Sequence, residues 1–215
     1  MIRLYYSPRA CSLAAHIALE EAGAGFEARR VAIADGDNGK PDYLAVNPRG
    51  FVPALEVDGA VITENVAVLT YIACRWPEAG LLPFERPLAL ARVLQQMAFL
   101  ATSVHTAFAQ VWRPQRFTPD EHAHPPLIEG GRSRILGFYS EIDGLLATSQ
   151  HFAGDGMTLA DPYLLVFYRW GNRIGLDMSY PHWTRHSARM LARPAVQRAL
   201  AREGLDAGDF APAGG

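Results

Sequence analysis

The chain has 215 residues, 49% of them hydrophobic, so it is long enough to bury a core in one large domain or two small ones. Its formal net charge of -2 is spread along the sequence, which argues against nucleic acid or an anionic membrane as the main partner. Small molecules are the expected ligands. Cys11 and Cys74 are its two cysteines, too few for a disulfide framework and not spaced as metal ligands.

The hydropathy pattern of the sequence shows none of the targeting signals expected of an exported or membrane protein. No basic and apolar leader precedes the first strand-like run, and no apolar run approaches the roughly 20 residues that a membrane span needs. We therefore predict a cytoplasmic protein without a membrane partner.

The first part of the chain alternates between strand and helix patterns. An apolar run, Ile2–Tyr6, precedes a helical stretch with Leu13 and Ile17 four residues apart, and a strand-like Phe26–Ile33 follows. This order predicts a βαβ unit.

A hairpin is predicted next. The runs Ala54–Val57 and Ala60–Ile62 are joined by Asp58-Gly59, the strongest short hairpin signal. A helix is then expected from Thr63 to Trp76, ended by a proline.

Beyond residue 87 the strand pattern disappears and helical patterns replace it, with breaks at prolines and glycines that include Pro181 and Pro194. The predicted helical stretches are Pro87–Trp112, Pro126–Thr148, Leu159–Gly175 and Trp183–Glu203. We predict an α/β unit over residues 1–80 and an all-helical unit over residues 87–205.

Cys11 is placed where the first strand ends and the first helix begins. Unpaired backbone N–H groups and the helix dipole favour a thiolate at such a position, and would equally stabilise the sulfur anion of a ligand. The alternative is a small, buried and inert residue.

Two further junctions suit a peptide-like ligand. A cis bond at Val52-Pro53 would expose the backbone of Val52 as an edge for an extended ligand, although most such bonds are trans. At Thr63-Glu64-Asn65 a helix N-terminus offers a carboxylate site, or only an ordinary cap.

Two other features of the helical part have structural interpretations. His105 is a lone histidine on a mostly apolar helix, where a satisfied core residue is commoner than a catalytic one. Thr158 to Asp161 form a variant capping box that opens the next helix.

Together these segments resemble the cytosolic glutathione transferases, specifically the bacterial beta class, over nearly the whole chain. The segments that carry the resemblance, in the family's order, are Tyr6 to Leu13, Asn47 to Leu55, Thr63-Glu64, and Thr158 to Asp161 with Arg169-Trp170. The resemblance implies a thioredoxin-like N-terminal domain, an all-helical C-terminal domain, and a homodimer with the active site near the subunit interface.

The resemblance also implies roles for individual residues. Cys11 would lie at the glutathione sulfur and could form a mixed disulfide with it, and His105 would point toward the same sulfur. The implied glutathione-binding residues are Val52, Pro53 in the cis form, Glu64 and Asn65 at the γ-glutamyl end, and Thr102 from the helical domain.

The electrophile is expected to meet an apolar, partly aromatic wall, although the same side chains could be packing. The candidates for this wall are Tyr6, Arg9, Phe108, Trp112 and Phe117. Cys74 is expected to be buried and without chemistry.

Three positions depart from the family pattern. Asn65 is bulkier than the glycine or serine usual there, Thr106 replaces a common lysine, and Ala98 replaces an asparagine. Glutathione is anionic, so we expect the loss of cationic groups either to weaken its binding or to shift the binding onto arginines such as Arg113.

The predicted function is conjugation of glutathione thiolate to apolar or aromatic electrophiles, with thiol–disulfide exchange through Cys11 as a variant. Glutathione is the thiol substrate, and no metal is expected. The alternative is a non-catalytic ligand carrier or protein-binding regulator. Such relatives tend to lose the residues that this chain keeps as Cys11 and Glu64.

Overall fold

The structure, a computed structural model, describes residues 1–211. Its N-terminal part contains a four-stranded mixed sheet with the strand order β2-β1-β3-β4. The strands are β1 (Ile2–Tyr6), β2 (Glu27–Arg30), β3 (Ala54–Val57) and β4 (Ala60–Thr63). β1 pairs parallel with β2 and antiparallel with β3, and β3 pairs antiparallel with β4. The sheet and its helices form the thioredoxin-like unit predicted from the sequence.

The hairpin between β3 and β4 turns where the sequence predicts it. Asp58 and Gly59 both have positive φ, 48° and 87°, as a tight hairpin turn of matching twist requires. β2 is shorter than the predicted Phe26–Ile33, because the chain leaves the sheet after Arg30 and continues into short 3₁₀ turns.

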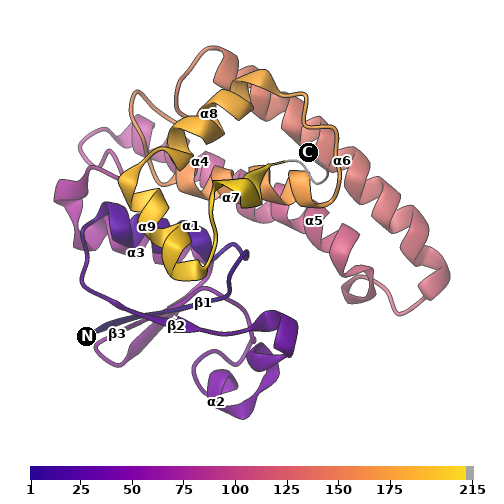
Figure 1. The fold of residues 1–215 in the computed structure, drawn as a ribbon, viewed down its shortest axis with the longest axis horizontal. Helices are drawn as coiled ribbons and strands as arrows, with labels where there is room; N and C mark the ends of the chain where they lie inside the picture. The colour runs from indigo at the N-terminus through magenta and orange to yellow at the C-terminus, as the bar shows by residue number, and fades with distance from the viewer. Residues whose placement is uncertain (212–215) are drawn as a thin grey trace.

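Helices α1 (Leu13–Glu21) and α3 (Asn65–Arg75) lie between the sheet and the helical half of the molecule (Figure 1). Leu4 and Leu55, paired across β1 and β3, are fully buried in the core that these helices help to form. The short helix α2 (Pro41–Leu44) lies away from the helical half.

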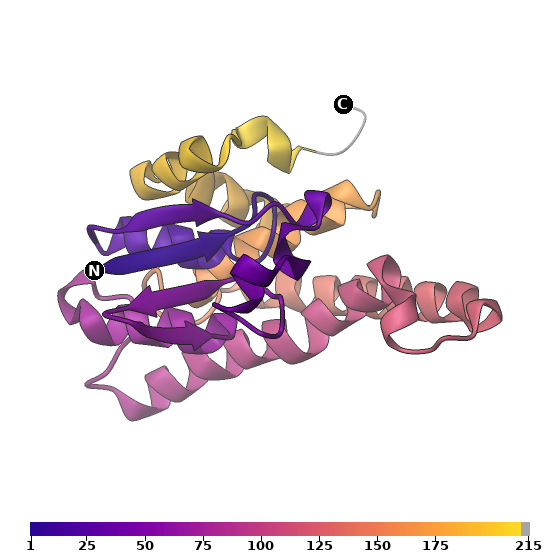
Figure 2. The ribbon, with the colours of Figure 1, turned by 90° about the horizontal axis from the view of Figure 1, so that it is seen from below.

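The second half of the chain is helical. Its helices are α4 (Pro87–Phe99), α5 (His105–Trp112), α6 (His124–Ala147), α7 (Ala160–Arg173), α8 (Pro181–Leu191) and α9 (Pro194–Glu203). Figure 2 shows α4, α5 and α6 running past the sheet on one side, while α9 lies on the other. Prolines open α8 and α9, as the predicted breaks at Pro181 and Pro194 imply.

The predicted helix Pro87–Trp112 is not a continuous α-helix. A π-helical stretch over Leu100–Val104 separates α4 from α5 and ends immediately before His105. Local widening of this kind is frequent at functional sites and escapes a reading of apolar periodicity.

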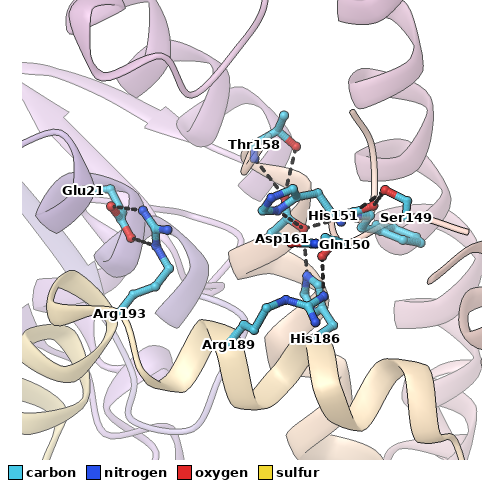
Figure 3. A network of polar contacts seen from close by, with 10 residues as sticks. Glu21, Ser149, Gln150, His151, Thr158, Asp161, His186, Arg189 and Arg193 are labelled. Carbon is cyan, nitrogen blue, oxygen red and sulfur yellow. Dashed lines mark hydrogen bonds and ion pairs between the residues drawn. The ribbon is translucent and has the colours of Figure 1, made fainter. Parts of the chain in front are cut away.

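The start of α7 is held by a buried polar network around Asp161 (Figure 3). One carboxylate oxygen accepts the backbone N–H of Thr158 at 2.8 Å, and the other accepts that of Phe152 at 2.9 Å. His186 of α8 lies 2.7 Å from the same carboxylate. Burial raises the pKa of Asp161, but the hydrogen bonds and His186 outweigh it and the net shift is downward. The segment is structural, as predicted.

We expect Asp161→Ala to lower the free energy of unfolding by roughly 3 kcal/mol or more, because it leaves buried donors without an acceptor. Urea denaturation at pH 7 measures the change. Asp155→Ala removes an exposed ion pair with Arg86 and is the matched control, expected to lose less than about a third as much. Equal losses for the two variants would contradict the role given to Asp161.

Candidate active site

A cavity of about 790 Å³ lies between the loops of the sheet and the helical half of the molecule. Its N-terminal side is formed by the segment after β1, the loop before β3 and the start of α3. Its C-terminal side is formed by α5 and α7. The cavity thus collects residues that are far apart in the sequence.

Cys11 lies in the turn between β1 and α1, on the cavity wall. Its thiol donates a hydrogen bond to the carbonyl oxygen of Val52 at 3.4 Å, and its side chain is buried. The turn is held by Ser12, whose hydroxyl accepts the N–H of Ser7 and donates to the carbonyl of Ser7. The structure therefore places Cys11 and Val52 together, as the resemblance implied.

The thiol of Cys11 is not favoured as a thiolate where the structure places it. Burial raises its pKa to about 12, and the backbone N–H groups of Cys11 and Ser12 oppose this only in part. The prediction of a lowered pKa is wrong at this position, because removal of the sulfur from water outweighs the N–H groups at the helix start.

The loop before β3 presents Val52 to the cavity. The carbonyl oxygen of Phe51, in this loop, accepts hydrogen bonds from the Tyr43 hydroxyl at 2.6 Å and the Asn47 side-chain amide at 2.7 Å. The peptide bond between Val52 and Pro53 is cis, as predicted. Both residues line the cavity.

Gly50 is required for the path of this loop. Its φ is 65°, a value that favours glycine, and a Cβ at this position would lie only 2.8 Å from the backbone oxygen of Asn38. The side-chain amide of Asn38 in turn donates a hydrogen bond to the Gly50 carbonyl at 3.0 Å. A larger residue would displace the loop that carries Val52.

Glu64 and Asn65 face the cavity at the start of α3. The helix begins at Asn65, one residue after Glu64 and two after Thr63, which belongs to β4 instead of capping the helix as predicted. Glu64 has a φ of 69°. Non-glycine residues with such a backbone conformation are uncommon and occur most often at functional sites. Its exposed carboxylate pairs with Arg49 at 3.0 Å.

Asn65 links the start of α3 to Cys11. Its amide donates to the carbonyl oxygen of Cys11 at 3.0 Å, while its own Oδ1 is buried without a hydrogen-bond partner among residues 1–211. The extra bulk of this asparagine is therefore used to tie the two helix starts together.

His105 reaches the same cavity from α5, against the ring of Trp170 at 5.0 Å between centroids. Burial, together with the smaller effect of the positive charges of Arg113 and Arg116, lowers its pKa to about 4. The imidazole is therefore neutral at pH 7, and can accept or donate one hydrogen bond without carrying charge.

Of the predicted electrophile wall, Arg9 and Trp112 line the cavity. Tyr6 and Phe108 do not: both are buried, Tyr6 with its hydroxyl on the Arg202 carbonyl and Phe108 against Trp112 and Trp170. Tyr6 and Phe108 were predicted to form part of the electrophile wall, but in the structure both pack in the core.

Three other predicted positions also lie away from the cavity lining. Thr102 is exposed, and its hydroxyl donates to the Ala98 carbonyl of its own helix. Phe117 is exposed. Cys74 is exposed, contrary to prediction, because Ile72 and Ala73 occupy the buried face of α3.

The sequence interpretation missed several cavity residues on α7. Tyr163, Arg169 and Arg173 all line the cavity, and Trp170 stands between the two arginines. Tyr163 is buried, and its pKa is raised by burial and by the nearby Cys11. Arg169 and Arg173 are four residues apart and so lie on one side of the helix, a signal that fits core packing equally well.

Comparison with known proteins identifies the family. Family models for the N-terminal and C-terminal domains of glutathione S-transferase match residues 2–74 and 115–194. A glutathione S-transferase of Escherichia coli O157:H7 is 35% identical over 211 residues, covering 95% of this chain and 100% of that protein. The chain belongs to the glutathione S-transferase family.

Solved structures agree with this assignment. A glutathione transferase homologue from Sulfitobacter with bound glutathione has a TM-score of 0.89 and 33% identity, covering 95% of this chain and 99% of its own. A beta-class glutathione S-transferase of Sphingomonas chungbukensis has a TM-score of 0.83 and 38% identity, and the match covers 94% of this chain and 99% of that chain. The predicted family and fold class are confirmed.

Within residues 1–211 of this transferase, no group of three or more histidine, cysteine, aspartate or glutamate side chains is arranged to hold a metal ion. None of the helices described there has both the length and the apolar character to cross a membrane.

The lowered pKa of His105 predicts a neutral imidazole across the physiological pH range. The ring signals of His105, assigned by their loss in His105→Gln, should stay constant between about pH 5.5 and 8 and shift near pH 4 in an NMR titration. Because the folded pKa lies below the unfolded one, stability should fall as pH falls from about 6.5 to 4, and less so in the variant. A midpoint above pH 6 would contradict this assignment.

Proposed function

We propose that the chain conjugates glutathione to electrophiles, and that Cys11, Val52, Glu64, Asn65 and His105 form the glutathione site. The observation that carries the proposal is their convergence on one cavity, with Cys11 on the Val52 carbonyl at 3.4 Å and Asn65 on the Cys11 carbonyl at 3.0 Å. The homologue structures whose names include bound glutathione support the same ligand.

Glutathione docks as an extended peptide along Val52, whose backbone pairs with its cysteinyl unit. The γ-glutamyl carboxylate lies at the N-terminus of α3, where unpaired N–H groups favour an anion. Its ammonium group pairs with Glu64, and this placement puts the thiol toward Cys11 and His105.

The glutathione thiolate is stabilised by neutral hydrogen-bond partners and by nearby arginines, and Cys11 takes part without being ionised. Cys11 and His105 are both neutral near pH 7, so each acts as a hydrogen-bond partner for the sulfur. Arg113 and Arg116, whose charges already act on His105, add a positive field that lowers the thiol pKa of glutathione.

In the chemical step the sulfur attacks the electrophilic carbon, a C–S bond forms, and the leaving group departs with its electron pair. The thiol proton passes to solvent as the thiolate forms. The electrophile lies against Trp112 and Trp170, whose rings are 4.8 Å apart between centroids. The protein supplies orientation and electrostatic stabilisation.

Thiol–disulfide exchange through Cys11 has less support. The reaction needs an accessible thiol with a pKa near the ambient pH, whereas Cys11 is 8% exposed with a pKa raised to about 12. Conjugation is therefore the preferred reaction.

We further propose a cytoplasmic homodimer, as the family resemblance implies. Phe51, beside Val52, and Leu88 on α4 are large apolar side chains exposed on the surface, and a second copy would cover such residues.

Glu64→Gln should raise KM for glutathione by about tenfold or more, because a charge-assisted contact to the ligand ammonium is lost. Steady-state conjugation kinetics measure this, and Glu78→Gln on the exposed surface is the matched control, expected to be unchanged. Retention on immobilised glutathione should follow the same order. If the unaltered chain does not bind millimolar glutathione, the enzyme proposal fails and the carrier or regulator alternative gains support.

Cys11→Ala should keep conjugation within about tenfold, since one neutral hydrogen bond is worth about 1 kcal/mol. Glutathione-dependent disulfide exchange, if present in the unaltered chain, should vanish. Cys74→Ser provides the matched control for loss of a thiol elsewhere. A fall in conjugation of about a thousandfold or more would show instead that Cys11 is essential to thiolate formation.

A further inference from the structure

The cavity is strongly cationic although the chain as a whole is weakly acidic. Five arginines line it. They are Arg9, Arg113, Arg116, Arg169 and Arg173. Among the described lining residues the only carboxylate is that of Glu64, which already pairs with Arg49. A cavity with this surplus of positive charge favours anionic ligands.

Arg169 is a buried arginine of the cavity lining with hydrogen-bond donors that are not used. Its side chain is 4% exposed, and its Nε and Nη2 have no hydrogen-bond partner among residues 1–211. Asp209 lies 3.5 Å from Nη2, but it also pairs with Arg9 at 3.3 Å. A buried guanidinium with unused donors is unfavourable unless an acceptor reaches it.

The surrounding charges strengthen this argument. The pKa of Arg169 is lowered by burial and by the like charges of Arg9 and Arg173, against the attraction of Asp209. Arg173 is one helical turn beyond Arg169 on α7, so both side chains leave the same face of the helix. An anion at this corner would relieve the repulsion and occupy the free donors.

Glutathione alone does not account for these arginines. With its thiol ionised it carries a net charge of about -2, and its γ-glutamyl end is placed at α3. In the proposed docking its glycyl end lies beyond Val52, where Arg116 is available to the carboxylate, because the Arg116 guanidinium carbon lies 5.0 Å from the ring centroid of Phe51. Arg169 and Arg173 then remain for the second substrate.

An aromatic surface made by Trp112 and Trp170 stands beside these two arginines. The ring of Trp170 is fixed by its N–H, which donates to the Arg9 carbonyl at 3.0 Å, and it packs edge to face against Trp112. Trp112 is partly exposed on the cavity. The surface suits a planar ring, and the arginines beside it suit a carboxylate on that ring.

We propose that the electrophile selected by this cavity is a planar, aromatic carboxylate, with its anionic group on Arg169 and Arg173 and its ring against Trp170 and Trp112. The inference rests on the proposed conjugation reaction and names the substrate class of the same site.

The test uses two electrophiles of similar shape, 4-chloro-3,5-dinitrobenzoate, which is anionic, and the corresponding carboxamide, which is neutral. In both, the glutathione sulfur bonds to the ring carbon, chloride leaves with the bonding electrons, and the thiol proton goes to the buffer. Each kcat/KM is divided by the rate constant of the uncatalysed reaction with glutathione, which removes the difference in intrinsic reactivity. We expect a normalised preference for the carboxylate of about tenfold or more.

Arg173→Gln should reduce kcat/KM for the carboxylate by about fivefold or more and leave the amide and KM for glutathione within about twofold. Arg173 is exposed, so the variant should fold, and Arg169→Lys tests the buried partner by loss of the planar donor pair. Arg185→Gln, on the exposed surface of α8, is the control and should change neither substrate.

Three results would overturn the inference. Equal normalised rates for the carboxylate and the amide would show no selection for charge. Equal losses for both substrates in Arg173→Gln would assign that arginine a structural role, and a rise in KM for glutathione would assign it to the thiol substrate. Conversion of neither compound would overturn the conjugation proposal itself, and the inference with it.

Discussion

The packing of α1 between the sheet and the C-terminal helices is the constraint on which the site depends. His16 of α1 lies 3.0 Å from Glu203 of α9, and both side chains are fully buried. At the end of α1, Glu20 pairs with Arg198, and Glu21 pairs with Arg193. These contacts hold the two halves of the chain in one arrangement, and Cys11, just before α1, thereby lines the same cavity as residues of α7. Without this packing, the residues of the two halves would not share a cavity.

That arrangement has an electrostatic consequence. Burial makes Cys11 difficult to ionise and His105 difficult to protonate, so both remain neutral under conditions in which a reactive thiolate is needed. Positive charge is supplied instead by Arg113 and Arg116, which follow α5, by the arginines of α7 and by the N-terminus of α3. The protein therefore places arginines around the cavity and keeps Cys11 and His105 uncharged within it.

The sequence predicts the fold well because the fold depends on local signals. The apolar run of β1, the Asp58-Gly59 turn and the prolines before α8 and α9 each determine their own element. The π-helical stretch before His105 could not be predicted, since its apolar pattern differs little from that of an α-helix. The cavity residues Cys11, Val52 and Glu64 could be singled out because they lie at chain junctions, where turns and helix starts have recognisable sequence patterns. The residues of α7 were missed because a helix face that lines a cavity has the same periodicity as one that lines a core.

The pattern of charge was the least predictable property, and it decides the chemistry of the site. A net charge of -2 spread along the sequence suggests no preference for anions. Folding separates the charges: Glu20, Glu21 and Glu203 are used to join α1 to α9, whereas Arg9, Arg169 and Arg173 meet at the cavity, with Asp209 between the first two. Total charge governs long-range behaviour, but a ligand in a partly buried site responds to the few groups within several ångströms, where screening is weak. The acidic residues of α1 therefore do not offset the arginines at the cavity, and a chain that is weakly acidic overall presents a cationic site.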